Sequence, residues 1–158
     1  MDTPKTSRRE FCAHAISLVT VTSLIEGCGG KGNPNTPGGG GNAPPLATIS
    51  GSVAGAAVTV NIDAAGPLAS VGSAALVRAS AGPGVFLVTR TGQDTFNAFT
   101  AICTHEQCEV TGFSSGTFVC PCHGSQYNTS GRVQAGPATQ ALRQFATQFT
   151  NSVLTITV

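Results

Sequence analysis

Two short segments of this chain each place a cysteine and a histidine close together, and they limit the possible fold more than any other feature. The first runs from Cys103 to His105 and the second from Cys120 to His123. Fourteen residues separate His105 from Cys120, which is enough chain to bring the two segments face to face. Thiolates and imidazoles are strong metal ligands. The sequence therefore predicts two loops that meet at a binuclear metal site.

The same region resembles the Rieske iron-sulfur proteins in three runs of sequence. These runs are C-T-H-E-Q-C from residue 103, C-P-C-H-G-S-Q-Y from residue 120 and G-R-V-Q-A-G-P-A from residue 131. A Rieske [2Fe-2S] cluster has two cysteines on one iron and two histidines on the other. The resemblance implies that Cys103 and Cys120 hold the inner iron, while His105 and His123 hold the outer, solvent-facing iron.

The resemblance also assigns the remaining polar residues of these runs. Cys108 and Cys122 match a cysteine pair that forms a disulfide between the two cluster loops in the respiratory branch of the family. Ser125 matches a serine that donates a hydrogen bond to a bridging sulfide, and Tyr127 matches a tyrosine that donates to a ligand cysteine, here Cys103. Such donors stabilise the reduced cluster and raise its potential, towards the upper part of the roughly −150 to +300 mV Rieske range.

The composition agrees with a single metal centre. After residue 28 the chain has four cysteines, two histidines and one tyrosine, and all of them lie in the first two runs. The alternative is a zinc-stabilised binding module with no redox role, since zinc also takes cysteine and histidine ligands. Zinc knuckles usually show pairs of the form C-x2-C, whereas here the pairs are C-x-H and C-x2-H. The spacing therefore favours the cluster.

Residues 1–28 are predicted to be an export signal. The run Ser7-Arg8-Arg9-Glu10-Phe11 is a twin-arginine signature, and the apolar residues 11–25 that follow contain no lysine or arginine. The signal ends at Cys28, which lies in a lipobox-like sequence, so we expect lipidation there. The alternatives are an ordinary cleaved signal and an uncleaved membrane anchor, although a spanning helix needs about 20 residues. The expected location is the periplasmic side of a bacterial inner membrane.

Residues 29–47 are rich in glycine and proline and are predicted to be a flexible tether. Residues 48–158 then form one domain. Alternation of apolar and polar residues predicts strands at 58–62 and 154–158, and the apolar run 85–88 predicts a central strand. The expected fold is all-β, a Rieske fold with an antiparallel β-sandwich-like base and a cluster-binding subdomain of two loops.

One segment has two periodicities. Phe145 and Phe149 with Leu142 fit a helix face, yet Phe145, Thr147 and Phe149 also alternate as on a strand. In Rieske domains this stretch returns to the base sheet, so the resemblance predicts a strand at 143–150. The preceding Gly136-Pro137 matches a loop that packs beside the cluster and limits access of water.

The predicted function is one-electron transfer. By resemblance, the chain is the iron-sulfur protein of a quinol:cytochrome c reductase-like complex, with a quinol as electron donor and a cytochrome c-type acceptor. The outer histidines would bind a proton more tightly when the cluster is reduced, which links electron transfer to proton transfer. Lysines and arginines nearly balance the acidic residues after residue 28 and form no basic patch, so nucleic acid is not expected as a partner.

Glu106 supports a second interpretation. The quinol-oxidising subunits typically carry Leu-Gly between the histidine and the disulfide cysteine, whereas this chain has Glu106-Gln107. A carboxylate fits poorly against a lipid-facing quinol pocket, and Glu106 together with Glu109 should lower the potential somewhat. The chain could instead be a small electron-transfer subunit of an exported, arsenite-oxidase-like oxidoreductase, with a large subunit as the electron donor.

Overall fold

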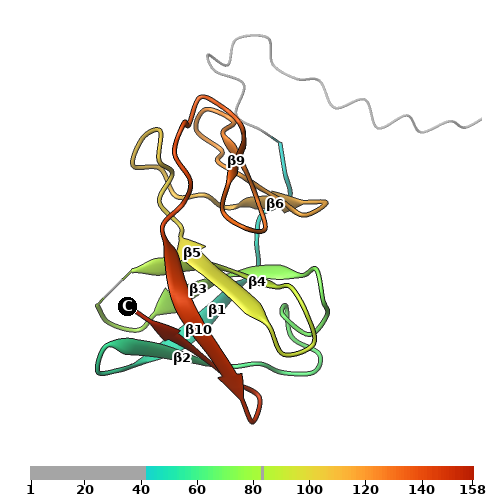
Figure 1. The fold of residues 1–158 in the computed structure, drawn as a ribbon, viewed down its shortest axis with the longest axis vertical. Coiled ribbons are helices and arrows are strands. Elements are labelled where there is room, and N and C mark those ends of the chain that lie inside the picture. The colour runs from blue at the N-terminus through green and yellow to red at the C-terminus, as the bar shows by residue number, and fades with distance from the viewer. Residues whose placement is uncertain (1–41, 83) are drawn as a thin grey trace, which may run out of the picture. The chain divides into compact units, whose positions relative to one another are not determined.

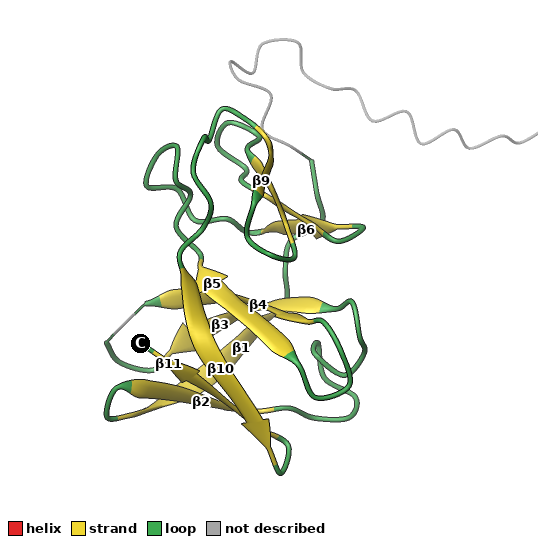
Figure 2. Cartoon of the chain, in the orientation of Figure 1, coloured by secondary structure: helices red, strands yellow, loops and turns green. Residues whose placement is uncertain are grey.

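The computed structural model describes residues 42–82 and 84–158, which form eleven strands and contain no helix. The predicted export signal, Cys28 and most of the tether lie outside the described residues. The strands are β1 (Thr48–Ala54), β2 (Ala57–Asn61), β3 (Ala74–Ala79), β4 (Val85–Arg90), β5 (Phe96–Thr100), β6 (Gly112–Ser114), β7 (Thr117–Val119), β8 (Gln126–Asn128), β9 (Val133–Ala135), β10 (Gln144–Thr150) and β11 (Val153–Thr157). The all-β prediction is therefore confirmed for this part of the chain (Figure 2).

Seven strands close into a barrel in the order β1-β2-β11-β10-β5-β4-β3. The closure depends on β1, which pairs antiparallel with β2 through its second half and parallel with β3 through its first half. Because β1 joins both edges, the β-sandwich-like base expected from the sequence is closed into a barrel. All other pairings in the barrel are antiparallel.

The remaining four strands form a small antiparallel sheet in the order β6-β7-β8-β9. The chain leaves the barrel after β5, forms this sheet and returns as β10, which pairs with β5. The small sheet is therefore an insertion between two neighbouring strands of the barrel. In Figure 1, β4 and β5 lie between this sheet and β2. We call the insertion, residues 101–143, the cluster subdomain.

The wall formed by β3, β4 and β5 is buried on both faces. Val77 and Val88 belong to the core inside the barrel, whereas Leu76, Leu87 and Phe99 belong to a second core shared with the cluster subdomain. The last three are direct cross-strand neighbours, since Leu76 pairs with Leu87 and Leu87 with Phe99. Burial on both faces explains why residues 85–88 are continuously apolar. The predicted central strand is confirmed.

The segment with two periodicities is the strand β10. Its residues alternate between exposed and partly buried, as expected for a strand with one face towards the core. Phe145 lies edge-on to Phe86 with ring centroids 5.0 Å apart, and Phe149 lies 4.9 Å from Phe96. These contacts fill the barrel interior from alternate positions. The strand prediction is confirmed, as are those for 58–62 and 154–158.

The end of the predicted tether packs against the cluster subdomain. Leu46 is buried in the shared core, and its amide donates to the carbonyl of Thr111. Pro44 accepts a hydrogen bond from the amide of Phe113, and Pro45 pairs with Gly112. Ordered packing therefore begins before Thr48, since Leu46 is already part of the core.

The junction between barrel and cluster subdomain requires a glycine at position 131. A Cβ added there would lie 2.6 Å from Cε1 of Phe99, and the backbone has a φ of +73°. We expect Gly131→Ala to lower the free energy of unfolding by about 2–4 kcal/mol, from overpacking and left-handed strain together. Gly116→Ala is the matched control, since its φ is +77° and nothing lies within 4 Å. Urea denaturation measures both; equal losses would contradict the packing argument.

Candidate metal centre

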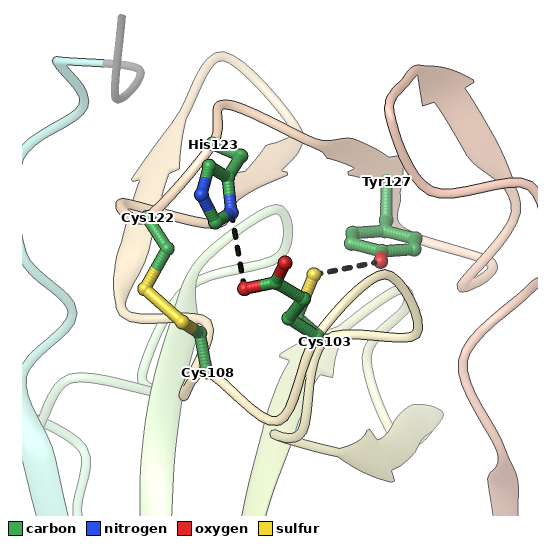
Figure 3. Close-up of a disulfide and its surroundings, with 6 residues drawn as sticks. Cys103, Cys108, Cys122, His123 and Tyr127 are labelled. Carbon is green, nitrogen blue, oxygen red and sulfur yellow. Dashed lines mark hydrogen bonds and ion pairs between the residues drawn. A yellow bond between two sulfur atoms is a disulfide. The ribbon is translucent and has the colours of Figure 1, made fainter. Parts of the chain in front are cut away.

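Two loops of similar construction form the tip of the cluster subdomain. The first spans residues 103–108 and the second connects β7 to β8 over residues 120–125. In each loop the first amide donates to the carbonyl of the sixth residue, from Cys103 to Cys108 at 2.8 Å and from Cys120 to Ser125 at 2.9 Å. Each loop is therefore a closed turn that begins with a buried cysteine. Figure 3 shows the two loops facing each other.

Cys103 and Cys120 are the free cysteines of the described residues, and they are only 3% and 1% exposed. Burial raises the pKa of the Cys103 thiol, but hydrogen bonds from Tyr127 and the His105 backbone outweigh burial and lower it overall. Burial and the neighbouring Cys103 sulfur raise the pKa of Cys120. A metal cation bound by the two sulfurs would favour two thiolates.

His105 and His123 lie on the outer side of the same two loops and are both exposed. Their ring centroids are 5.0 Å apart and the ring planes are nearly perpendicular, at 86°. The exposed carboxylate of Glu106 lies beside them, with 3.7 Å between its Oε2 and Nδ1 of His123. These three side chains offer ligand atoms within 4.8 Å of one another.

A disulfide between Cys108 and Cys122 joins the two loops (Figure 3). Their Cα atoms are 6.5 Å apart, and their sulfurs lie within 4.8 Å of the Cys120 sulfur. The link therefore fixes one loop to the other directly beside a buried thiol.

The Tyr127 hydroxyl is fully buried under the first loop. It lies 3.3 Å from the Cys103 sulfur and accepts a hydrogen bond from the amide of Thr104 at 3.1 Å. The Thr104 hydroxyl donates to the carbonyl of Gln140, so it can only accept from Tyr127, at 3.0 Å. The single Tyr127 proton is therefore available to either the Cys103 sulfur or the Thr104 oxygen. A thiolate favours donation to sulfur, because charge-assisted hydrogen bonds are stronger.

Ser125 is also fully buried, and its hydroxyl accepts a hydrogen bond from the amide of Ala138 at 3.0 Å. This bond attaches the Gly136-Pro137 loop to the second cluster loop. Because a hydroxyl also has a proton to donate, Ser125 keeps that proton for a further acceptor.

Two residues that support this arrangement are not predicted from the sequence. Thr104 lies between two predicted ligands, and Gln140 acts through its backbone carbonyl, which carries no side-chain signal. Their contact spans 36 positions of sequence. Only the folded chain brings the Gly136-Pro137 loop back over Thr104.

The fold and the donor set define a class of protein. A β-barrel carries two linked loops whose buried thiols and exposed imidazoles match the ligands of a mixed cysteine and histidine iron-sulfur centre. The sequence profile of the Rieske [2Fe-2S] domain matches residues 64–146, and the chain belongs to the Rieske family. It therefore carries one [2Fe-2S] cluster and transfers single electrons.

Relatives of known identity agree with this assignment. The cytochrome b6-f complex iron-sulfur subunit of Prochlorococcus marinus strain NATL1A is 34% identical, over 89% of this chain and 79% of that protein. The corresponding subunit of strain MIT 9303 is 43% identical, but the match covers 52% of this chain and 48% of that protein.

A solved structure was also matched. The plasma membrane Rieske protein from Synechocystis PCC 6803 is 30% identical over 54% of this chain and 86% of that one, with a TM-score of 0.48. Among the residues that the structure describes here, no helix is long and apolar enough to cross a membrane.

The disulfide closes a loop with a sequence separation of 14 residues. We expect the double substitution Cys108→Ala with Cys122→Ala to lower the free energy of unfolding by about 2–4 kcal/mol. It should also speed the loss of the cluster's visible absorbance, because the loops would separate more easily. Wild-type protein treated with a thiol reductant is the matched sample, because it loses the same disulfide without a substitution, and untreated wild type is the reference. An unchanged rate of cluster loss in both samples would show that the shared core alone holds the loops together.

Proposed function

We propose that this chain is the iron-sulfur subunit of a quinol-oxidising complex related to the cytochrome bc and b6-f complexes. Cys103 and Cys120 would hold the inner iron, and His105 and His123 the outer iron. The observation that carries the proposal is the difference in exposure within the donor set. The two thiols are buried and the two imidazoles face solvent. When bound, the cluster supplies a one-electron couple.

The exposed histidines are the side of the centre that a donor can reach. Each imidazole has two nitrogens, so one remains available when the other is bound to iron. That nitrogen can accept a hydrogen bond from a quinol hydroxyl and so position the donor within electron-transfer distance. The thiols are instead buried in the shared core, which also contains Ala138, the residue after Pro137.

Two buried hydroxyls are proposed to tune the centre. Tyr127 is placed to donate to the Cys103 sulfur, and the Ser125 hydroxyl in the second loop can still donate its own hydrogen. Both donors would favour the more negative, reduced state. The disulfide between Cys108 and Cys122 would keep the loops closed over the cluster.

The acceptor and location are proposed from the sequence and the relatives. A cytochrome c-type protein would take the electron, and the domain, residues 48–158 with the packed residues 44–47, would be tethered to the periplasmic side of the inner membrane. The tether would be residues 29–43, attached through a lipid on Cys28 or through an N-terminal anchor.

A second candidate is favoured by Glu106. Its side chain is 60% exposed beside His123, at a position where the resemblance to the quinol-oxidising subunits implies a leucine. A small electron-transfer subunit of an exported oxidoreductase would meet a polar protein surface at this point instead. We prefer the first candidate because the cytochrome b6-f iron-sulfur subunit of Prochlorococcus marinus strain NATL1A aligns with 89% of this chain.

A redox titration followed by electron paramagnetic resonance tests the proposal. We expect the spectrum typical of a mixed-ligand [2Fe-2S] cluster and a positive midpoint potential. A low midpoint with the same spectrum would favour the second candidate. A colourless protein containing zinc would contradict both.

We expect Tyr127→Phe to keep the cluster but lower its midpoint potential, since the reduced state loses a hydrogen-bond donor to Cys103. Thr91→Val is the control, because it removes a hydroxyl in the turn between β4 and β5 and so leaves the cluster loops unchanged. Potentiometry on both variants measures the effect. Equal potentials in Tyr127→Phe and wild type would refute the assigned role of the tyrosine.

A further inference from the structure

One ion pair connects the barrel to the base of the first cluster loop. Arg78, at the end of β3, donates two parallel hydrogen bonds to Glu109, with Nη1 at 3.1 Å from Oε2 and Nη2 at 2.5 Å from Oε1. The side chains are 47% and 28% exposed, so the pair lies at the surface with the carboxylate partly covered. Neither residue is among the ligands or the tuning groups described above.

Glu109 lies close to both halves of the centre. It directly follows Cys108, whose disulfide partner Cys122 stands between Cys120 and His123. It also pairs across an isolated β-bridge with Ile102, the residue before Cys103. One bridge and one peptide step place the Glu109 Cα within about 10 Å of the Cys103 Cα. That distance is comparable with the screening length of physiological salt.

We propose that Arg78 is a positioning residue that sets the potential of the centre by holding and neutralising the Glu109 carboxylate. The inference rests on the proposed ligand set, since it needs the cluster beside Cys103. Alone, the carboxylate would oppose the arrival of an electron, and partial burial would strengthen that effect. Paired in a bidentate geometry, the two charges nearly cancel at the cluster. A cation fixed on the rigid barrel wall therefore offsets an acidic residue on the loop stem.

The same ion pair could act only as a mechanical link between barrel and loop. The two roles give different signs. Arg78→Met and Glu109→Gln both break the ion pair, so a purely mechanical role moves the potential in the same direction in both variants. An electrostatic role moves it in opposite directions, because one variant leaves a negative charge and the other a positive charge.

The test is a dye-mediated redox titration of the cluster-loaded, full-length protein in four forms: wild type, Arg78→Met, Glu109→Gln and the double variant. We expect Arg78→Met to lower the midpoint potential and Glu109→Gln to raise it. Each shift should correspond to a change of about 2- to 5-fold in the equilibrium constant for reduction. The double variant should return close to wild type. Arg78→Lys should have a midpoint potential close to that of the wild type, since it keeps the positive charge that Arg78→Met removes.

Two controls separate the possible outcomes. Asp94→Asn removes one negative charge in the turn between β4 and β5, so it should leave the potential unchanged if the effect is local. High salt should shrink the differences between variants.

Shifts of the same sign in both single variants, or no shifts, would overturn the role of Arg78. Absence of the cluster spectrum from the wild type would instead overturn the proposed function. If Arg78→Met does not fold, the sign of the shift in midpoint potential in Glu109→Gln, together with the potential of the double variant, still distinguishes the electrostatic from the mechanical role.

Discussion

The structure depends on a barrel wall that is buried on both sides. Strands β3, β4 and β5 send alternate side chains into the barrel and into the core beneath the cluster loops. Leu76, Leu87 and Phe99 form a row in register on the outer face, and Phe118 and Tyr127 of the small sheet belong to the same core. Because interiors are close-packed, this row fixes the height and orientation of the cluster subdomain. The two loops of the metal centre are therefore held in place by the outer face of the barrel wall.

The centre itself has a gradient of exposure. The thiols lie against the shared core, the disulfide links the loops beside them, and the imidazoles face water. This order suits the proposed ligand set, since the soft thiols are kept dry while the imidazoles proposed to face the donor stay accessible. The two acidic side chains near the centre also differ in their surroundings. Glu106 is exposed beside His123 at the tip, whereas Glu109 is bound by Arg78 at the stem.

Much of the fold was predictable because its patterns are local. Alternating residues in β2 and β11 and the apolar run in β4 indicated strands directly. The segment now seen as β10 was ambiguous, because its phenylalanines fit both periods and only the pairing with β5 decides between them. The closure of the barrel through β1 was not predicted, since hydrogen bonds to two partners leave no pattern in one strand. Leu46 was assigned to the tether because its glycine- and proline-rich neighbours outweighed a single apolar residue.

The sequence by itself determined the chemistry of this protein. After residue 28, cysteine, histidine and tyrosine are confined to two short runs, and their spacing within each run is a local property that needs no folding to read. The tertiary structure decided which groups meet. It brought the Gln140 carbonyl to Thr104, the Ala138 amide to Ser125 and Arg78 to Glu109, over separations of 36, 13 and 31 residues. Such contacts depend on loop geometry and packing across the barrel wall, and backbone donors and acceptors are identical in every residue other than proline.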